Sequence, residues 1–342
     1  DIESYLAGRP LVAAPESKAY RARKWMRRNR AVVRTVALGA VALTIGLGYG
    51  PAAEAYHEWS ETKRMNAFEV LAQDPDPAVV IDADVRERIK ATGKPWKIQH
   101  TASGIVMLLC PPGEFLMGSP ETEKDRRRDE VQHKRVISEA FYLSQNEVSG
   151  AEWRAIAGSD PGSREGDDLP VESVSWNNIR EDFLAPSRGF FRLPSEAEWE
   201  YACRAGTTTA FSFGETITKE QVCFNRMSMK PVACGSLPAN PWGFHEMHGN
   251  VSEWVEDVFA AYPKEAGGQE AVKGGASTVR LQGTVVGRDG QAVVAGGAST
   301  YRVLRGGSWL DRSFYLRSSY RTYFAPSGAF DSVGFRVARA PL

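Results

Sequence analysis

Residues 191–206, FRLPSEAEWEYACRAG, carry the strongest local signal in the chain. Ser195 is followed three positions later by Glu198, which is the spacing of a capping box at a helix N-terminus. The stretch therefore predicts a helix from Ser195 to Arg204. Its large aromatic, Trp199, lies among glutamates, so the helix is expected to combine an apolar anchor with carboxylates that face arginines.

The rest of the chain also contains large aromatics, arginines and glycines that are expected to build the core. Glycine is abundant, at 32 residues, and there are 9 tryptophans, which suits a loop-rich fold whose core depends on large aromatics. Four tryptophans are expected to be core anchors: Trp176, Trp199, Trp254 and Trp309. Four arginines are expected to pair with Glu196, Glu198, Glu200 or backbone carbonyls: Arg192, Arg204, Arg305 and Arg336. Gly306 and Gly307 would let backbone segments approach closely.

From about residue 101, short apolar segments alternate with Gly, Pro and Ser, as in a fold of short strands and turns. We predict strands at 105–109, 115–118 and 136–143, and helices at 146–157 and 195–204. Little helix signal follows Gly206. Residues 267–300, in which the pentapeptide GGAST occurs twice, are predicted to form a glycine-rich hairpin insertion.

Seven segments occur in a fixed order: GEFLMGS (113–119), NEV (146–148), LPVESVSW (169–176), the 191–206 stretch, NPWGFHEMHGNVSEW (240–254), LRGGSW (304–309) and GFR (334–336). Together they resemble the sulfatase-modifying-factor, or formylglycine-generating enzyme, family. The resemblance covers residues 101–342. It implies an α+β fold of the C-type-lectin class with little regular secondary structure, and most of the motif residues are interpreted as scaffold.

The resemblance also implies an oxidase that binds copper through two cysteines just after the Arg-Gly-Gly-Ser motif, because thiolate is the soft ligand that copper(I) requires. Residues 309–320, WLDRSFYLRSSY, contain no cysteine. We therefore predict no copper and no catalytic residue. The four cysteines lie elsewhere, at Cys110, Cys203, Cys223 and Cys234. Cys203 is expected to be buried, and Cys223 and Cys234 could form a disulfide, which spacing alone does not decide.

Other catalytic sites have weaker support. A related branch of the family uses a three-histidine iron site, but His57 and His100 precede the domain and His245 and His248 lie in a scaffold motif. Each of these histidines is interpreted as structural. Serine and cysteine triads have no support in the sequence.

Residues 246–253, EMHGNVSE, match the calcium loop of the family. The resemblance implies two carboxylates and three backbone oxygens as calcium ligands, from Glu246 and Glu253 and from Met247, Gly249 and Val251. Calcium prefers oxygen ligands of this sort. The alternative is a glutamate-rich turn held by arginine or lysine. The family usually has tryptophan where Ser252 stands, which loosens the packing beneath the loop.

Residues 310–332 mix aromatics with small polar residues, as antibody paratopes do. The segment contains no Lys, Glu, Gln, Met or Trp, the types that codons ending in a pyrimidine cannot encode. It therefore resembles the variable proteins of diversity-generating retroelements, which carry this fold. The alternative is a core segment that lacks these types by chance. We predict ligand contacts at Leu310, Asp311, Arg312, Phe314, Tyr315, Tyr320, Thr322, Tyr323, Phe324, Ala329, Phe330, Asp331 and Ser332.

The N-terminal residues suggest a membrane anchor. A run of basic residues from Lys18 to Arg34 contains no acid, and residues 35–49 contain no charge. We interpret 1–34 as a cytoplasmic basic tail and 35–53 as a single transmembrane helix, with everything after it outside by the positive-inside rule. A buried helix and a cleaved signal peptide are the alternatives. Residues 54–100 are interpreted as a juxtamembrane helical stalk, with an amphipathic helix from 52 to about 73 and a short helix at 83–91.

The overall charge argues against a nucleic-acid partner. The chain has 42 basic and 42 acidic side chains, so no net positive charge favours nucleic acid. Residues 1–34 resemble the tail of bacterial membrane-anchored serine/threonine kinases, although the kinase motifs are absent from this sequence.

These patterns predict a non-catalytic, single-pass bacterial inner-membrane protein with its C-terminal domain periplasmic or extracellular. The domain would bind a protein or cell-surface ligand through residues 310–332. Two alternatives remain: a formylglycine-generating oxidase or related metal oxidoreductase, and the ectodomain of a kinase-like receptor.

Overall fold

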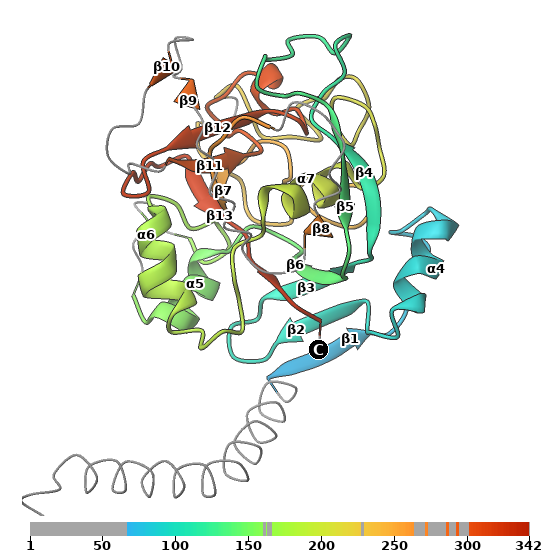
Figure 1. The fold of residues 1–342 in the computed structure, drawn as a ribbon. Helices are drawn as coiled ribbons and strands as arrows, with labels where there is room; N and C mark the ends of the chain where they lie inside the picture. The colour runs from blue at the N-terminus through green and yellow to red at the C-terminus, as the bar shows by residue number, and fades with distance from the viewer. Residues whose placement is uncertain are drawn as a thin grey trace, which may run out of the picture. The chain divides into compact units, whose positions relative to one another are not determined.

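The structure, a computed structural model, describes residues 67–159, 162, 166–226, 229–262, 271–272, 285–286, 292–293 and 301–341. A five-stranded sheet has the order β1-β2-β3-β6-β14 and is antiparallel throughout. Its strands are β1 (Phe68–Ala72), β2 (Lys97–His100), β3 (Val106–Cys110), β6 (Phe141–Ser144) and β14 (Ala338–Arg339). The last strand of the chain thus pairs with β6, far from it in sequence (Figure 1).

A four-stranded sheet has the order β12-β11-β7-β13. It consists of β7 (Ser252–Val258), β11 (Arg302–Arg305), β12 (Arg321–Phe324) and β13 (Val333–Phe335). Strand β11 pairs antiparallel with β7 and β12, whereas β13 runs parallel to β7. This sheet carries the Arg-Gly-Gly-Ser motif at the end of β11 and the Gly-Phe-Arg motif on β13. Segment 310–332 therefore lies between two of its strands and includes a third, β12.

Two smaller sheets complete the strand set of the described residues. Strands β4 (Gly113–Met117), β5 (His133–Ile137) and β8 (Ala271–Val272) form one, and β9 (Val285–Val286) and β10 (Ala292–Val293) form an antiparallel pair. The β9–β10 pair agrees with the hairpin predicted within 267–300, and the rest of that stretch lies outside the described residues.

The helices are short. They are α4 (Ala83–Ala91), α5 (Gly150–Ala157), α6 (Trp176–Asn178), the π-helical turn η1 (Ile179–Leu184), α7 (Glu196–Arg204) and the 3₁₀ turn η2 (Ser313–Tyr315). The capping box predicted at Ser195 is present: Ser195 Oγ accepts from Glu198 N at 3.2 Å, and Glu198 Oε2 accepts from Ser195 N at 2.8 Å.

Every residue of α7 is buried, and the helix contacts β4, β5, β7 and β11 (Figure 1). Such a position is unusual for a helix with three glutamates, because buried charges need partners. The main core surrounds it with aromatic side chains. All four tryptophans predicted as anchors, Trp176, Trp199, Trp254 and Trp309, are at most 7% exposed. The predicted mixed α and β architecture with limited regular structure is confirmed.

Two element predictions need correction. Residues 136–143 form parts of two strands rather than one, because β5 pairs with β4 whereas Phe141–Ser144 pairs with β3 in the other sheet. The helix expected from Asn146 begins only at Gly150. Ser149 is its N-cap in a second capping box with Glu152, and Val148 donates its N–H to Phe335 O instead.

The predicted stalk at 54–100 is wrong over its described part. Residues 68–72, expected to end an amphipathic helix, form β1, and β1 and β2 extend the five-stranded sheet. Phe68 is 7% exposed, and its ring lies 5.0 Å from His100 and 3.9 Å from the Arg339 guanidinium. The helix predicted at 83–91 is confirmed as α4. The domain therefore includes the chain from Phe68 onward.

The proposed basic tail and transmembrane helix, 1–34 and 35–53, lie outside the described residues. Within the part that the structure describes, no helix has the length and apolarity needed to cross a bilayer.

Replacing Phe68 with alanine tests whether β1 belongs to the domain. The variant loses the ring contacts with His100, Phe190 and Phe191, so the free energy of unfolding should fall by about 3 kcal/mol in urea denaturation. Val70→Ala on the same strand is the control, because Val70 is 50% exposed and its truncation should cost under about 0.5 kcal/mol. Equal stabilities of the two variants would mean that β1 is a detached stalk.

Candidate functional site

The glutamates of α7 hold three arginines in the interior. Glu196 accepts from Arg321 at 2.6 and 2.8 Å and from Arg305 at 3.2 Å. Glu200 accepts from Arg305 at 2.5 Å and from Arg204 at 2.9 Å. Burial alone would raise the pKa of Glu196, but Arg321 and Arg305 outweigh burial and lower it. The Glu196 carboxylate is therefore charged, and guanidinium groups face both Glu196 and Glu200.

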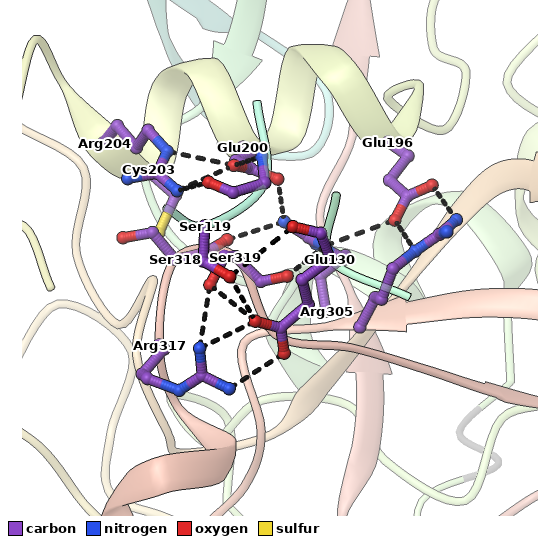
Figure 2. Close-up of polar contacts among 12 residues, drawn as sticks. Ser119, Glu130, Glu196, Glu200, Cys203, Arg204, Arg305, Arg317, Ser318 and Ser319 are labelled. Atoms are coloured by element: carbon purple, nitrogen blue, oxygen red, sulfur yellow. Dashed lines mark hydrogen bonds and ion pairs between the residues drawn. The ribbon is translucent and has the colours of Figure 1, made fainter. Parts of the chain in front are cut away.

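A second part of the network joins segment 310–332 to the loop between β4 and β5. The Arg317 guanidinium donates to both oxygens of Glu130 at 2.8 Å and to Glu123 at 2.5 Å (Figure 2). Ser319 Oγ lies within 3.2 Å of the same two carboxylates. Glu130 is 0% exposed and Arg317 only 2%. The ion-pair network is defined by Glu123, Glu130, Glu196, Glu200, Arg204, Arg305, Arg317 and Arg321.

The network also fixes the backbone of the segment. Arg305 donates to the carbonyl oxygens of Ser318 and Ser319, at 2.6 and 3.3 Å. Figure 2 shows these serines between the Arg305 and Arg317 side chains. Residues 317–319 are therefore held in two ways: the Arg317 side chain is buried in ion pairs, and Arg305 binds the carbonyl oxygens of Ser318 and Ser319. This stretch has little freedom to move when neighbouring side chains change.

The remaining arginine predictions are confirmed. Arg192 pairs with Glu198 at 2.6 Å. Arg336 makes two bonds to Glu253, at 2.7 and 2.8 Å, and donates to the His245 carbonyl. The close approach expected at Gly306 and Gly307 is present as well. Both have positive φ, and a Cβ on Gly307 would lie 2.7 Å from the Tyr315 carbonyl oxygen. Only glycine suits that contact.

The cysteines do not form a two-thiolate copper site. All four are free, so the Cys223–Cys234 disulfide allowed by spacing is not formed. Burial raises the pKa values of Cys110 and Cys234 well above the ordinary range and that of Cys203 to about 12, which disfavours the thiolate. Since copper(I) of this family would need a pair of thiolates after Ser308, the residues present do not fit it.

Cys203 is the thiol that lies near segment 310–332, beside His248. Cys203 Sγ is 3.7 Å from His248 Nε2. His248 Nδ1 lies 2.7 Å from the Leu316 carbonyl oxygen, and Nε2 accepts from Ser212 N at 3.1 Å. Burial lowers the pKa of His248 to about 4, so the ring is neutral at pH 7. These contacts make His248 a structural link between two loops, as the sequence predicted.

The carboxylates of the calcium loop have partners within the protein. Glu246 accepts from Gly235 N and Leu237 N at 2.8 and 3.0 Å. Glu253 accepts from Arg336 and from Trp199 Nε1 at 2.7 Å. No group of three or more His, Cys, Asp or Glu side chains in the described residues is placed to hold a metal. These contacts resemble the arginine-held turn considered above, and calcium at Glu246, Met247, Gly249, Val251 and Glu253 stays a prediction.

Most of the predicted ligand contacts reach the surface. Four are exposed: Arg312, Ala329, Phe330 and Asp331. Eight are half-buried: Leu310, Asp311, Phe314, Tyr315, Thr322, Tyr323, Phe324 and Ser332. Buried residues that belong to the ion-pair network or its backbone contacts, Arg317, Ser318, Ser319 and Arg321, interrupt the series. The segment thus combines a fixed interior with outward-facing side chains.

Tyr320 is the exception among the predicted contacts. It is only 6% exposed, with its ring 5.1 Å from Tyr315 and the Arg127 guanidinium 5.6 Å from the ring centre. Because Tyr315 and Arg127 cover it, Tyr320 supports the surface from beneath and does not itself offer contact area.

The aromatics of the segment do not form a single stack. Phe314 and Tyr315 lie 4.0 Å apart, and Phe324 and Phe330 lie 4.6 Å apart. Tyr323 stacks instead on Phe259, at 4.2 Å. Their ring contacts therefore divide the aromatics of segment 310–332 into separate groups.

The family model described as "Sulfatase-modifying factor enzyme 1-like domain" matches residues 96–341. The chain belongs to this family. Membership agrees with the observed fold and with the motifs that build the ion-pair network.

The relatives of this sulfatase-modifying factor domain include kinases as well as active and inactive formylglycine-generating enzymes. The serine/threonine-protein kinase pkn1 of Chlamydia pneumoniae is 28% identical over 264 residues, 68% of this chain and 38% of the kinase. Mouse formylglycine-generating enzyme is 28% identical over 60% of this chain and 53% of the enzyme. Bovine inactive C-alpha-formylglycine-generating enzyme 2 is also 28% identical, over 63% and 65%. Identity alone therefore does not separate active from inactive relatives.

The chain spans about two fifths of that kinase and about half of the mouse enzyme. Among solved structures, Treponema denticola variable protein 1 superposes with a TM-score of 0.57 at 22% identity, covering 72% of this chain and 100% of that one. This likeness shows a shared fold. The resemblances stated from the sequence to the formylglycine-generating enzyme family and to bacterial kinases are confirmed, and the resemblance to variable proteins is confirmed for the fold.

Removing the Arg317 charge tests the network of this family member. Arg317→Gln leaves Glu130 and Glu123 buried without their guanidinium, so the free energy of unfolding should fall by about 3–5 kcal/mol in urea. Arg312→Gln, five residues earlier and exposed, should change it by less than about 0.5 kcal/mol. If the two variants unfold at the same urea concentration, the Arg317 pairs do not fix the segment.

Proposed function

We propose that this protein is a non-catalytic, membrane-anchored ligand-binding protein of the bacterial inner membrane. It binds a protein or cell-surface ligand through the outward-facing side chains of residues 310–332. The single-pass anchor is the apolar segment 35–53, which leaves the domain periplasmic or extracellular. The partner is not nucleic acid, because the chain carries no net positive charge.

The observation that carries this proposal is that some residues of segment 310–332 are buried in ion pairs while others reach the surface. Arg317, Ser319 and Arg321 are buried in contacts with distant carboxylates, whereas the flanking side chains reach the surface. Side chains on such a backbone can be exchanged with little effect on the fold. Rigid aromatics also give contact area at low entropic cost, and small polar residues adapt to different ligands.

The composition of the segment supports exchange of this kind. Residues 310–332 lack Lys, Glu, Gln, Met and Trp, although the rest of the chain uses all five. Adenine-directed mutagenesis of asparagine codons would leave this signature. Treponema denticola variable protein 1 has the same fold, but at 22% identity its likeness bears on the fold alone.

The competing function is a formylglycine-generating oxidase or a related metal oxidoreductase. Family membership and the mouse enzyme favour it. Against it, residues 309–320 contain no cysteine, and Cys203, a thiol near this segment, is 0% exposed beside a neutral histidine. Copper-dependent oxidation of a cysteine-containing peptide by the purified protein would establish this alternative and remove the proposal.

A kinase-like receptor ectodomain is the third possibility, favoured by the Chlamydia relatives. The chain covers only 38% of the C. pneumoniae kinase, so the likeness concerns a part of that protein. Such a receptor would still use this domain to bind a ligand. The two functions therefore differ in what the domain is attached to and share the same surface.

Sequencing this gene from sister strains tests the proposal. Substitutions should concentrate at the surface positions of the segment, while Arg317, Ser319 and Arg321 stay constant because their loss leaves buried carboxylates unpaired. The surface positions are Arg312, Phe314, Tyr315, Ala329, Phe330 and Asp331. Substitutions spread evenly over the domain, or a segment that stays identical in strains that differ elsewhere, would contradict it.

A further inference from the structure

Two arginines from distant parts of the chain lie beside one tryptophan, Trp176. The Arg302 guanidinium stacks on the Trp176 ring, 3.8 Å from its centre, and the Arg180 guanidinium lies 4.8 Å from the same centre. Arg302 is the first residue of β11 and Arg180 belongs to η1, so both lie outside segment 310–332. The fold therefore brings two cations together at one aromatic ring.

Both arginines contact the same acidic residue. Arg180 Nη1 donates to Glu256 Oε1 at 2.8 Å, and Arg302 Nη1 donates to the Glu256 carbonyl oxygen at 2.6 Å. Burial raises the pKa of Glu256, and Arg180 and Arg302 oppose that rise. Two guanidinium groups thus share a single carboxylate.

Most of the donors of these two guanidinium groups are unused. Within the part of the chain that the structure describes, each side chain makes one hydrogen bond, to Glu256. Arg302 Nε is buried without a partner. The Arg180 side chain is 48% exposed, so its remaining N–H groups can reach a ligand. Because a guanidinium presents its donors in a planar fork, the pair suits a carboxylate.

The other charges next to Arg180 are exposed acids. Glu181 and Asp182 follow it on η1, and neither forms an ion pair with Arg180 or Arg302 in the described residues. Asp182 instead accepts from Asn178 Nδ2 at 3.2 Å. Solvent screens such exposed charges, but together with Glu256 they disfavour a doubly charged anion such as a phosphate. A singly charged carboxylate therefore fits the two arginines better.

Apolar side chains flank Arg302 on both sides. In the four-stranded sheet, Arg302 on β11 is directly opposite Phe324 on β12 and Val258 on β7 (Figure 1). Residues directly opposite in neighbouring antiparallel strands point to the same face, so the three side chains form a row. Phe330 packs against Phe324 at 4.6 Å. Val258 and Phe330 are 41% and 39% exposed, so the row presents apolar surface to solvent on both sides of the cation.

Backbone hydrogen bonds join this site to the proposed binding segment. Ser173 N donates to Phe330 O at 2.9 Å, and Asn177 N donates to Pro326 O at 3.0 Å. The loop that leads into the tryptophan is therefore held against the end of the segment. The two arginines thus lie next to aromatic side chains that the proposed function treats as exchangeable.

We propose that Arg180 and Arg302 form a carboxylate-binding site, which binds an acidic residue of a polypeptide partner. A neighbouring apolar residue of that partner packs on Phe324 and Phe330. This inference rests on the proposed function, because it names the chemistry of the partner at one end of segment 310–332. The carboxylate contact is the same whichever side chains the segment carries, since both arginines lie outside it.

Panning a phage-displayed library of random dodecapeptides on the immobilised full chain tests the site. The wild type should enrich peptides with Asp or Glu next to Leu, Ile, Phe or Trp. Arg180→Gln and Arg302→Gln should each recover about tenfold fewer of these phage, because each removes one guanidinium from the site. Lys90→Gln, which removes an exposed charge on α4, is the control and should recover as many as the wild type.

A double-mutant cycle with one enriched peptide decides whether Arg180 contacts its acid. Replacing the Asp or Glu of the peptide by the amide should weaken binding to the wild type about tenfold in fluorescence anisotropy. Binding to Arg180→Gln should weaken by about threefold or less, because one of the two cations is already gone. Arg180 is half-exposed, so this variant should unfold at the same urea concentration as the wild type. An equal loss on both proteins would mean that the acid binds elsewhere and that the site is wrong.

A further variant separates the site from the proposed function. Phe314→Ser/Tyr315→Ser changes the other end of the segment. If it loses peptide binding while the arginine variants keep it, the carboxylate site is wrong and segment 310–332 remains the binding surface. If all of these variants keep binding, both are wrong. Enrichment of basic peptides, or no enrichment over an empty support, overturns the carboxylate site.

Discussion

The structure depends on the pairing of two glutamates on a completely buried helix with arginines from distant parts of the chain. Glu196 and Glu200 on α7 bind Arg305 at the end of β11, Arg321 at the start of β12 and Arg204 within the helix. A buried carboxylate without a counter-charge is very unfavourable, so these contacts must form together for the domain to close. Arg317 with Glu130 and Glu123 extends the same constraint to the β4–β5 loop. The network therefore joins α7, β11, β12 and the β4–β5 loop, whatever its net contribution to stability.

This constraint would let the proposed binding segment keep its backbone fixed while its surface side chains vary. Between Trp309 and Val333, the chain is fixed wherever it enters the network and reaches the surface between those points. The backbone positions are set by Arg305, Arg317 and Arg321, by the serines between them and by Gly307. The exposed side chains make few of the contacts that fix the backbone. The motifs that identify the family specify this supporting fold. A fold that performs oxidation in other members can therefore also support binding.

The sequence predicted the features that depend on local spacing or on residue type. The Ser195–Glu198 capping box, the buried tryptophans and the arginine–glutamate pairing followed from rules that act within a few residues or on charge burial alone. The features it missed depend on partners far away in the chain. Phe68 is buried by Arg339 and Phe191, and Tyr320 is covered by Arg127, which no periodicity near either residue indicates. The contacts of Asn225 and Arg226 with Asp311 and Trp309 were also missed, because they are backbone hydrogen bonds, which do not depend on side-chain type.

The central claim is that the interior of segment 310–332 is fixed by charge pairing while its surface is free. The most direct measurement is a protease-resistance selection on a displayed library with two sets of positions randomised. The first set is Glu196, Glu200, Arg317 and Arg321, and the second is Arg312, Phe314, Ala329, Phe330 and Asp331. The account predicts that folded clones keep the original residues in the first set and accept nearly any residue in the second. Folded clones with apolar residues throughout the first set, or with the second set unchanged, would contradict it.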